Sequence, residues 1–136
     1  MEITLDAIKN NIDPLTARID SILEANDCPT KSKIQIDVAV DEIFSNIANY
    51  AYLEDGGTAT IIADVYENDG EKYFKLIFKD GGIPFNPLDR PDPDITLGVD
   101  ERQIGGLGIF MVKKTMDSVT YEYVDGCNIL TLVKKI

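Results

Sequence analysis

The glycine-rich stretch from Ile104 to Gly108 could bind an anion through its backbone. Gly105, Gly106 and Gly108 would let the chain approach a ligand closely, and the apolar, helix-like run behind them would offer the free N–H groups of a helix N-terminus. The stretch lacks the Walker A pattern, and it follows a proline-rich loop instead of the strand of a Rossmann fingerprint. Lys113 would lie roughly 7–8 Å further along the helix, so the backbone would be the binding group. A flexible lead-in to a helix is the alternative reading.

Asp80 stands at the end of an apolar, strand-like run and is followed by two glycines, in KDGGIPFNP. An aspartate in this place can accept a hydrogen bond from an amino group that lies in a pocket, and the glycines leave room beside it. The same residues are also typical of a simple turn. Taken alone, the stretch fits a turn better than a binding site.

A third polar cluster lies in DEIFSNIANYAY, which has the pattern of a helix. Glu42, Asn46 and Asn49 are spaced so that they share one helical face, opposite the apolar side chains. Most amphipathic helices have a solvated polar stripe of this kind. Asparagine is only a middling helix former, however, so two of them in mid-helix are less typical of a plain solvent face than lysine or glutamate.

The helices and strands that must position these stretches can be predicted from apolar spacing. The spacing predicts helices over residues 13–26, 33–52 and 106–116. Alternating runs predict a first strand at EITL and two hairpins, which turn at Asp69-Gly70 and Asp125-Gly126. Because the strands are grouped and do not alternate with helices, we predict an α+β fold. It would be a two-layer sandwich with three helices on one face of a mixed, mostly antiparallel sheet.

The stretch over about residues 84–104 carries prolines and acidic residues and has little apolar periodicity. A loop of this length inside a small domain is usually a functional lid or a disordered segment. We therefore predict one domain over residues 1–136, with a mobile lid at about 84–104.

Composition narrows the possible functions. A formal net charge of −11 argues against direct binding of nucleic acid, and any anionic ligand would need backbone N–H groups, helix ends or a metal ion. The chain has no histidine, which excludes histidine triads and histidine metal sites. No apolar run reaches the roughly 18 residues that span a membrane, and the first residues lack a signal-peptide pattern. The two cysteines have no metal or redox spacing. We expect a cytoplasmic protein that does not contact a membrane.

Taken together and in this order, the three stretches resemble those of the GHKL, or Bergerat-fold, ATP-binding domains. DEIFSNIANYAY is similar to the N-box, DGGIPFNP to the first glycine box, GGLGIFMVKKTMDSVTYEY to the second, and NILTLVKKI to the last strand. Within this group the chain resembles the small bacterial anti-sigma factor serine/threonine kinases over almost its whole length. The resemblance implies a histidine-kinase-like ATPase fold. It also implies an ATP-binding anti-sigma factor that uses Mg²⁺ to phosphorylate an anti-anti-sigma partner.

The resemblance also implies roles for single residues. Asn46 would supply its amide oxygen to Mg²⁺, and Glu42 would be the general base for a hydroxyl group that attacks the γ-phosphate. Asp80 would accept a hydrogen bond from the adenine amino group, while Gly82 would let the base lie close. Thr131, on the last strand, would border the adenine pocket.

The same resemblance extends to the lid and to the partners. The phosphate-facing end of the lid would consist of Gly105, Gly106, Leu107 and Gly108. Arg18 lies where the kinases that the chain resembles use a basic side chain against the sigma factor. A sigma factor, a STAS-type anti-anti-sigma protein and a homodimer are the implied partners.

Three positions depart from the family pattern. Tyr50 stands where the family often has histidine or lysine, and Ile104 stands where it often has arginine. Asn86 replaces the more usual aspartate. The first two changes leave a second hypothesis open, a nucleotide-gated switch that holds a partner without phosphorylating it. The ATPase domain of a histidine kinase is less favoured, because the chain has no histidine.

Overall fold

The computed structural model describes residues 1–89 and 107–136. In these ranges the chain forms five strands and three α-helices. In chain order they are β1 (Glu2–Asp6), α1 (Ile12–Ala25), α2 (Thr30–Asn46), β2 (Thr58–Asn68), β3 (Glu71–Asp80), α3 (Leu107–Thr115), β4 (Ser118–Val124) and β5 (Cys127–Lys135). A π-helical turn, η2 (Ile47–Ala51), extends α2, and 3-10 turns lie at η1 (Lys9–Asn11) and η3 (Pro87–Asp89). None of the helices described is long and apolar enough to cross a membrane.

The strands form one sheet in the order β1-β2-β3-β5-β4. Every pair of neighbouring strands is antiparallel. The sequence had suggested a mixed, mostly antiparallel sheet, whereas the described part of the sheet is wholly antiparallel. Each hairpin turns at an Asp-Gly pair, Asp69-Gly70 between β2 and β3 and Asp125-Gly126 between β4 and β5. Both residues of each pair have positive φ, as the type I′ turn requires. The register between β3 and β5 places Asp80 directly opposite Asn128.

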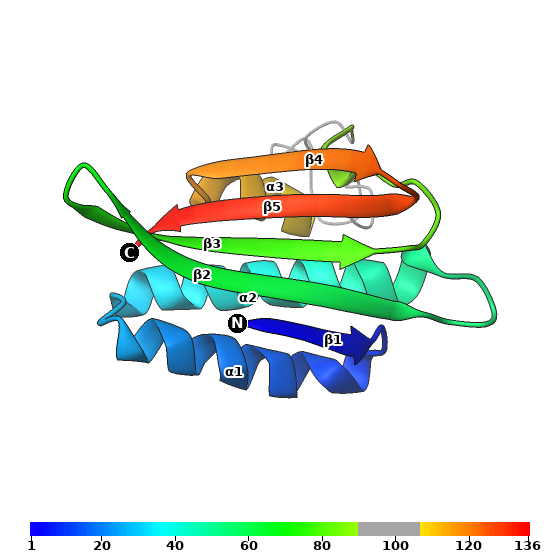
Figure 1. Ribbon diagram of the computed structural model, residues 1–136, viewed down its shortest axis with the longest axis horizontal. Helices are drawn as coiled ribbons and strands as arrows, with labels where there is room; N and C mark the ends of the chain where they lie inside the picture. The colour runs from blue at the N-terminus through cyan, green and yellow to red at the C-terminus, as the bar shows by residue number, and fades with distance from the viewer. Residues whose placement is uncertain (90–106) are drawn as a thin grey trace, which may run out of the picture.

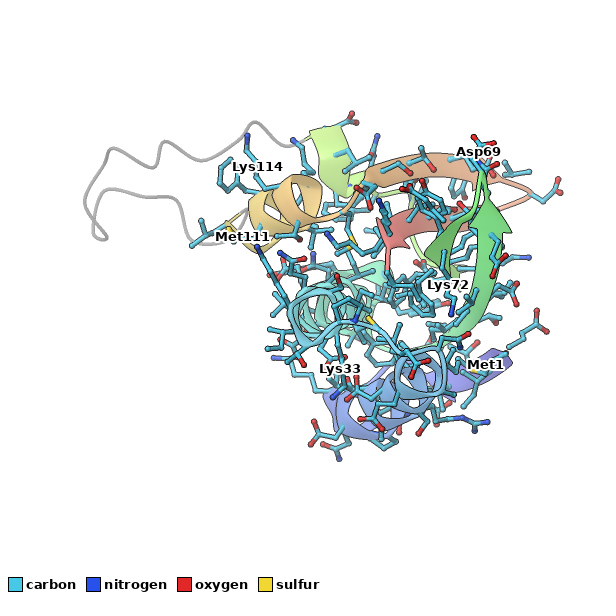
Figure 2. The ribbon with its side chains drawn as sticks, turned by 90° about the vertical axis from the view of Figure 1, so that its left-hand side faces the viewer. Met1, Lys33, Asp69, Lys72, Met111 and Lys114 are labelled. Carbon is cyan, nitrogen blue, oxygen red and sulfur yellow. The ribbon has the colours of Figure 1, made fainter. Side chains whose placement is uncertain are left out.

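All three helices cover the same face of the sheet (Figure 1). Seen from the end, in Figure 2, the helices and the strands separate into two layers. The alternation along β3 explains this arrangement, because Phe74, Leu76 and Phe78 all point to the helical side and are buried. The helices contribute buried side chains at helical spacing: Leu15, Ile19 and Leu23 from α1, Ile36, Val40, Ile43 and Phe44 from α2, and Ile109 and Val112 from α3.

The predicted elements and the α+β class are confirmed, with changes at the ends of the helices. The second helix begins at Thr30, directly after Pro29, and not at residue 33. It is α-helical only as far as Asn46, where the π-helical turn η2 carries the chain to Ala51. Turns of this kind are rare and often lie at functional sites. The change of helix type therefore directs attention to Asn46 and the residues after it.

A pair of carboxylates lies between α1 and α2. Asp20 and Asp37 each have one buried oxygen, Oδ1, with no hydrogen-bond partner. Lys33 Nζ lies 3.9 Å from Asp20 Oδ2 and 3.4 Å from Glu24 Oε1. Burial raises the pKa of Asp37 from 3.8 to about 7, and the neighbouring Asp20 carboxylate adds to the shift. Asp37 thus holds a proton in the folded protein at a pH where it would be ionised in the unfolded chain.

We expect this pair to make the folded protein less stable as the pH rises. Between pH 5 and pH 8 the folded state loses a proton that the unfolded state has already lost, so the free energy of unfolding should fall through this window. The expected fall is on the order of 1 kcal/mol, since water partly screens the half-buried pair. Urea unfolding at pH 5 and pH 8 would measure it. No histidine titrates in this window.

The Asp37→Asn variant should abolish this slope and should be the more stable protein at pH 8. Glu122→Gln, at an exposed position of β4, is the control and should keep the slope of the parent protein. A slope that persists in Asp37→Asn would show that Asp37 does not hold the proton.

Candidate functional site

A cavity opens where the end of α2, the turn η2 and the ends of β3 and β5 come together. About 420 Å³ of space lies between its walls, part of it open to solvent. Its walls are mostly apolar, and the polar side chains are few. The lining residues are Ile43, Asn46, Ile47, Ala51, Phe78, Asp80, Phe85, Pro87, Tyr121, Asn128 and Leu130. An apolar hollow with a few convergent polar groups is the usual form of a small-molecule site.

A second hollow continues from this cavity toward α3. The two share Asn46, Phe85 and Pro87, and the second also has Tyr50, Ile83 and Ile109 in its wall. Asp80 belongs to the inner cavity, whereas Ile109 of α3 belongs to the outer hollow. A ligand in the inner cavity could therefore extend past Asn46 from the end of β3 to α3.

Asp80 is the charged group of the inner cavity and is only 7 % exposed. Its Oδ1 atom accepts hydrogen bonds from the backbone N–H of Gly82, at 2.9 Å, and from the side-chain amide of Asn128, at 3.0 Å. Among the described residues no donor contacts the other oxygen, Oδ2. This carboxylate is thus held in place by protein donors and keeps one oxygen for a ligand.

The chain after β3 is held tightly against the end of η2. The N–H group of Ile83 donates to the carbonyl of Ala51 at 2.8 Å. A Cβ atom at Gly82 would come within 2.7 Å of the Ala51 Cβ atom and closer still to its carbonyl oxygen, so only glycine fits here. Gly81 has room, since its nearest neighbour would be the Tyr52 hydroxyl at 3.7 Å. That hydroxyl accepts from the N–H of Gly81 and donates to the carbonyl of Thr58.

Glu42 and Asn46 lie one turn apart on α2, both half-buried. The Asn46 side-chain nitrogen donates to Glu42 Oε1 at 3.3 Å, which leaves the amide oxygen of Asn46 available to a ligand. Gly108, in the first turn of α3, packs directly on the Glu42 carboxylate. A Cβ atom there would come within 2.6 Å of Glu42 Oε1 and closer still to Oε2. The α2–α3 contact therefore brings the start of α3 to Glu42.

The structure brings together most of the residues singled out from the sequence that lie in its described ranges. Asp80 and Asn46 line one cavity, Glu42 touches both Asn46 and Gly108, and Gly82 adjoins Asp80. Leu107 begins α3 and is exposed. Arg18 is exposed on α1, away from the cavity. Gly105, Gly106 and Ile104 lie outside the described residues, as does most of the lid predicted at about 84–104.

Thr131 is not brought to the cavity. On β5 the buried side chains are those of Asn128, Leu130 and Leu132, so the alternation of the strand turns Thr131 to the opposite face of the sheet. Asn128 and Leu130 line the cavity in its place. The expectation for Thr131 assumed the wrong face of a correctly predicted strand.

Sequence reasoning missed Asn128 and Tyr121. Asn128 is 6 % exposed and lies among buried apolar side chains. Tyr121, on the edge strand β4, donates its hydroxyl proton to Asn128 Oδ1. Burial raises the pKa of Tyr121, and the nearby charge of Asp80 adds to the effect, so the phenol remains a donor at neutral pH. An asparagine inside an otherwise apolar strand was the signal that could have revealed this position.

The residues present fit a magnesium ion that is held mainly by phosphate groups. The described residues contain no cluster of three or more histidine, cysteine, aspartate or glutamate side chains that could hold a metal alone. Mg²⁺ bound with a nucleotide typically needs only one or two protein oxygens, because phosphates and water supply the others. The amide oxygen of Asn46, which the hydrogen bond to Glu42 leaves available, is an oxygen donor of this kind.

Comparisons with known proteins identify the family of the chain. The sequence profile of a family described as "Histidine kinase-like ATPase domain" matches residues 5–134. The chain is 31 % identical over 97 residues to "Serine-protein kinase RsbW" of Bacillus thuringiensis (strain Al Hakam). The aligned region covers 68 % of this chain and 58 % of that protein. The chain is 30 % identical over 97 residues to the protein of the same description from Bacillus cereus (strain AH820), with the same coverage. The match thus spans 58 % of the length of these curated relatives.

Proposed function

The chain belongs to the histidine kinase-like ATPase domain family, and on that basis we propose that it is an ATP-binding anti-sigma factor with Mg²⁺-dependent serine/threonine kinase activity. Its substrate would be a small, STAS-type anti-anti-sigma protein. One observation carries the proposal. Asp80, which can accept a hydrogen bond from a purine amino group, and Asn46, whose amide oxygen suits a phosphate-bound metal ion, line one continuous hollow, and Glu42 is hydrogen-bonded to Asn46. The similarity to proteins described as serine-protein kinases supports the phosphoryl-transfer part.

In the proposed mechanism the adenine base occupies the inner cavity and its amino group donates to Asp80. The phosphates extend past Asn46 toward the start of α3, where backbone N–H groups and the helix dipole favour negative charge. The apolar wall of Phe78, Phe85 and Leu130 would exclude water from the base. A chain of net charge −11 has to hold phosphates in this way, because its overall field repels them.

The transfer step needs a hydroxyl group, a base and a leaving group. A serine hydroxyl of the partner attacks the γ-phosphorus, its proton passes to the Glu42 carboxylate, and the bond from the γ-phosphorus to the ADP oxygen breaks. Asn46 would hold Mg²⁺ through its amide oxygen, and the ion would neutralise phosphate charge when bound. Asn46 also positions Glu42 through their hydrogen bond.

The partners that the family resemblance implies are part of the proposal. Arg18, exposed on α1, would contact the sigma factor, and two copies of the chain would form a homodimer. Light scattering of the purified chain, alone and mixed with a sigma factor of its host, would test these associations.

A second function, a nucleotide-gated switch without kinase activity, is favoured by Tyr50. This side chain is 57 % exposed, and its ring centroid lies 6.5 Å from that of Phe85 in the wall of the outer hollow. An aromatic side chain here supplies no positive charge to the phosphates. Incubation with γ-labelled ATP, Mg²⁺ and the STAS-type proteins of the host separates the two functions. Label on a partner supports the kinase, and nucleotide-dependent binding without label supports the switch.

Nucleotide binding itself has a sharper test at Asp80. The Asp80→Asn variant keeps the shape of the side chain but removes the charged acceptor, and a hydrogen bond to a charged group contributes about 1.5–3 kcal/mol. We therefore expect its affinity for Mg-ATP to fall roughly 10- to 100-fold, measured by titration calorimetry. Asp125→Asn, at an exposed hairpin turn, is the matched control and should bind like the parent protein. Equal affinity of all three proteins would contradict the assigned base site.

A further inference from the structure

Asn128 forms the centre of a hydrogen-bond network in the wall of the inner cavity. Its amide nitrogen donates to Asp80 Oδ1 at 3.0 Å and to the carbonyl oxygen of Ile83 at 2.8 Å. Its amide oxygen accepts from the N–H of Phe85 at 3.0 Å and from the hydroxyl of Tyr121. An asparagine side chain can donate twice and accept twice, so all four of its capacities are used inside the protein.

The network fixes both the position and the polarity of Asp80. Two protein donors, Gly82 N–H and the Asn128 amide, occupy Oδ1, which restrains rotation of the carboxylate. The Asn128 amide cannot turn over, because the N–H of Phe85 can only donate and the carbonyl of Ile83 can only accept. The Tyr121 hydroxyl adds a second donor on the side of the amide oxygen. The remaining oxygen of Asp80 thus faces a ligand only as an acceptor.

We propose that Asn128 and Tyr121 are positioning residues that make the base site select a 6-amino purine over a 6-oxo purine. The inference rests on the proposed nucleotide binding at Asp80 and adds a source for its specificity. A 6-amino group donates to the fixed carboxylate, whereas a 6-oxo group brings a second acceptor against it and leaves both unpaired. An unpaired buried polar group costs about 1–3 kcal/mol, which corresponds to a preference of roughly 5- to 150-fold.

Loss of Asn128 should lower the selectivity more than a general loss of structure would. Without the amide donor, Asp80 can rotate or take up a water molecule that bridges it to a 6-oxo group. A purely structural defect weakens the binding of both nucleotides by the same factor. The ratio of the dissociation constants of ITP and ATP, which differ at the purine base, separates these cases.

The test compares Asn128→Val and Asn128→Thr, whose new side chains have the same shape as each other. Valine removes every polar contact, whereas threonine keeps one hydroxyl that can donate to Asp80 and fits the same strand. With Mg²⁺ present, we expect the ITP/ATP ratio to fall at least about fivefold in Asn128→Val and to stay nearer the parent value in Asn128→Thr. Thr120→Val, an exposed position on the outer face of β4, is the control and should leave the ratio unchanged.

Tyr121→Phe gives a second measurement that does not depend on the folding of Asn128→Val. It removes only the donor to Asn128 Oδ1 and should lower the ratio by a smaller factor. The inference would be overturned if Tyr121→Phe and every Asn128 variant that folds kept the ITP/ATP ratio of the parent protein. The proposed nucleotide binding would not be affected by that result. Absence of binding of either nucleotide to the parent protein would instead overturn the proposed function, and this inference with it.

Discussion

A Glu42→Gln protein should bind Mg-ATP but transfer its γ-phosphate to the partner about 10²- to 10⁴-fold more slowly, the range that a general base contributes. Glutamine keeps the length of the side chain and can still accept the hydrogen bond that the Asn46 side chain donates. It cannot take the proton of the attacking hydroxyl. The loss should therefore appear in the rate of transfer, measured as labelled partner over time at saturating ATP.

The neighbouring residue supplies the control for this prediction. Asp41 is exposed on the same helix, so Asp41→Asn also removes one negative charge but does so away from the site. It should transfer phosphate at the parent rate. Parent-like transfer by a folded Glu42→Gln protein would remove Glu42 as the base. Failure of Glu42→Gln to bind ATP would instead indicate that the carboxylate acts mainly in holding the metal ion and the phosphates.

The helices, the strands and the pairing of strands within each hairpin could be predicted from the sequence alone. Apolar spacing located the three helices, and Asp69-Gly70 and Asp125-Gly126 located the turns, because each of these signals is local. The shared helical face of Glu42 and Asn46 was predictable for the same reason, since helical geometry alone decides it.

Contacts between distant segments were not predictable in this way. The position of Asn128 opposite Asp80 depends on the register of β3 against β5, and a shift of one residue reverses which side chains face the cavity. Thr131 was assigned to the wrong face for this reason. The packing of Gly108 on Glu42 and the carboxylate pair of Asp20 and Asp37 likewise arise from the way the helices pack on one another.

The two adjacent glycines after β3 should respond very differently to alanine. In Gly82→Ala the new methyl group would overlap the backbone carbonyl of Ala51, which cannot move without disturbing η2. Overpacking of this kind typically costs about 1–3 kcal/mol. We expect a loss of unfolding free energy in that range. Because the N–H of Gly82 donates to Asp80, we also expect at least a tenfold loss of ATP affinity, for the same reason as in the Asp80→Asn variant. Urea unfolding and calorimetric titration would measure the two effects.

Gly81→Ala is the matched control, because a methyl group there would meet only the Tyr52 hydroxyl at an ordinary contact distance of 3.7 Å. It should remain within about 0.5 kcal/mol of the parent protein, as surface substitutions usually do. The double variant Gly82→Ala, Ala51→Gly distinguishes the cause. Removing the Ala51 methyl group leaves its carbonyl oxygen in place, so ATP affinity should not recover. Full recovery would mean that the clash is between side chains and that the backbone of η2 does not limit how closely the base site can close.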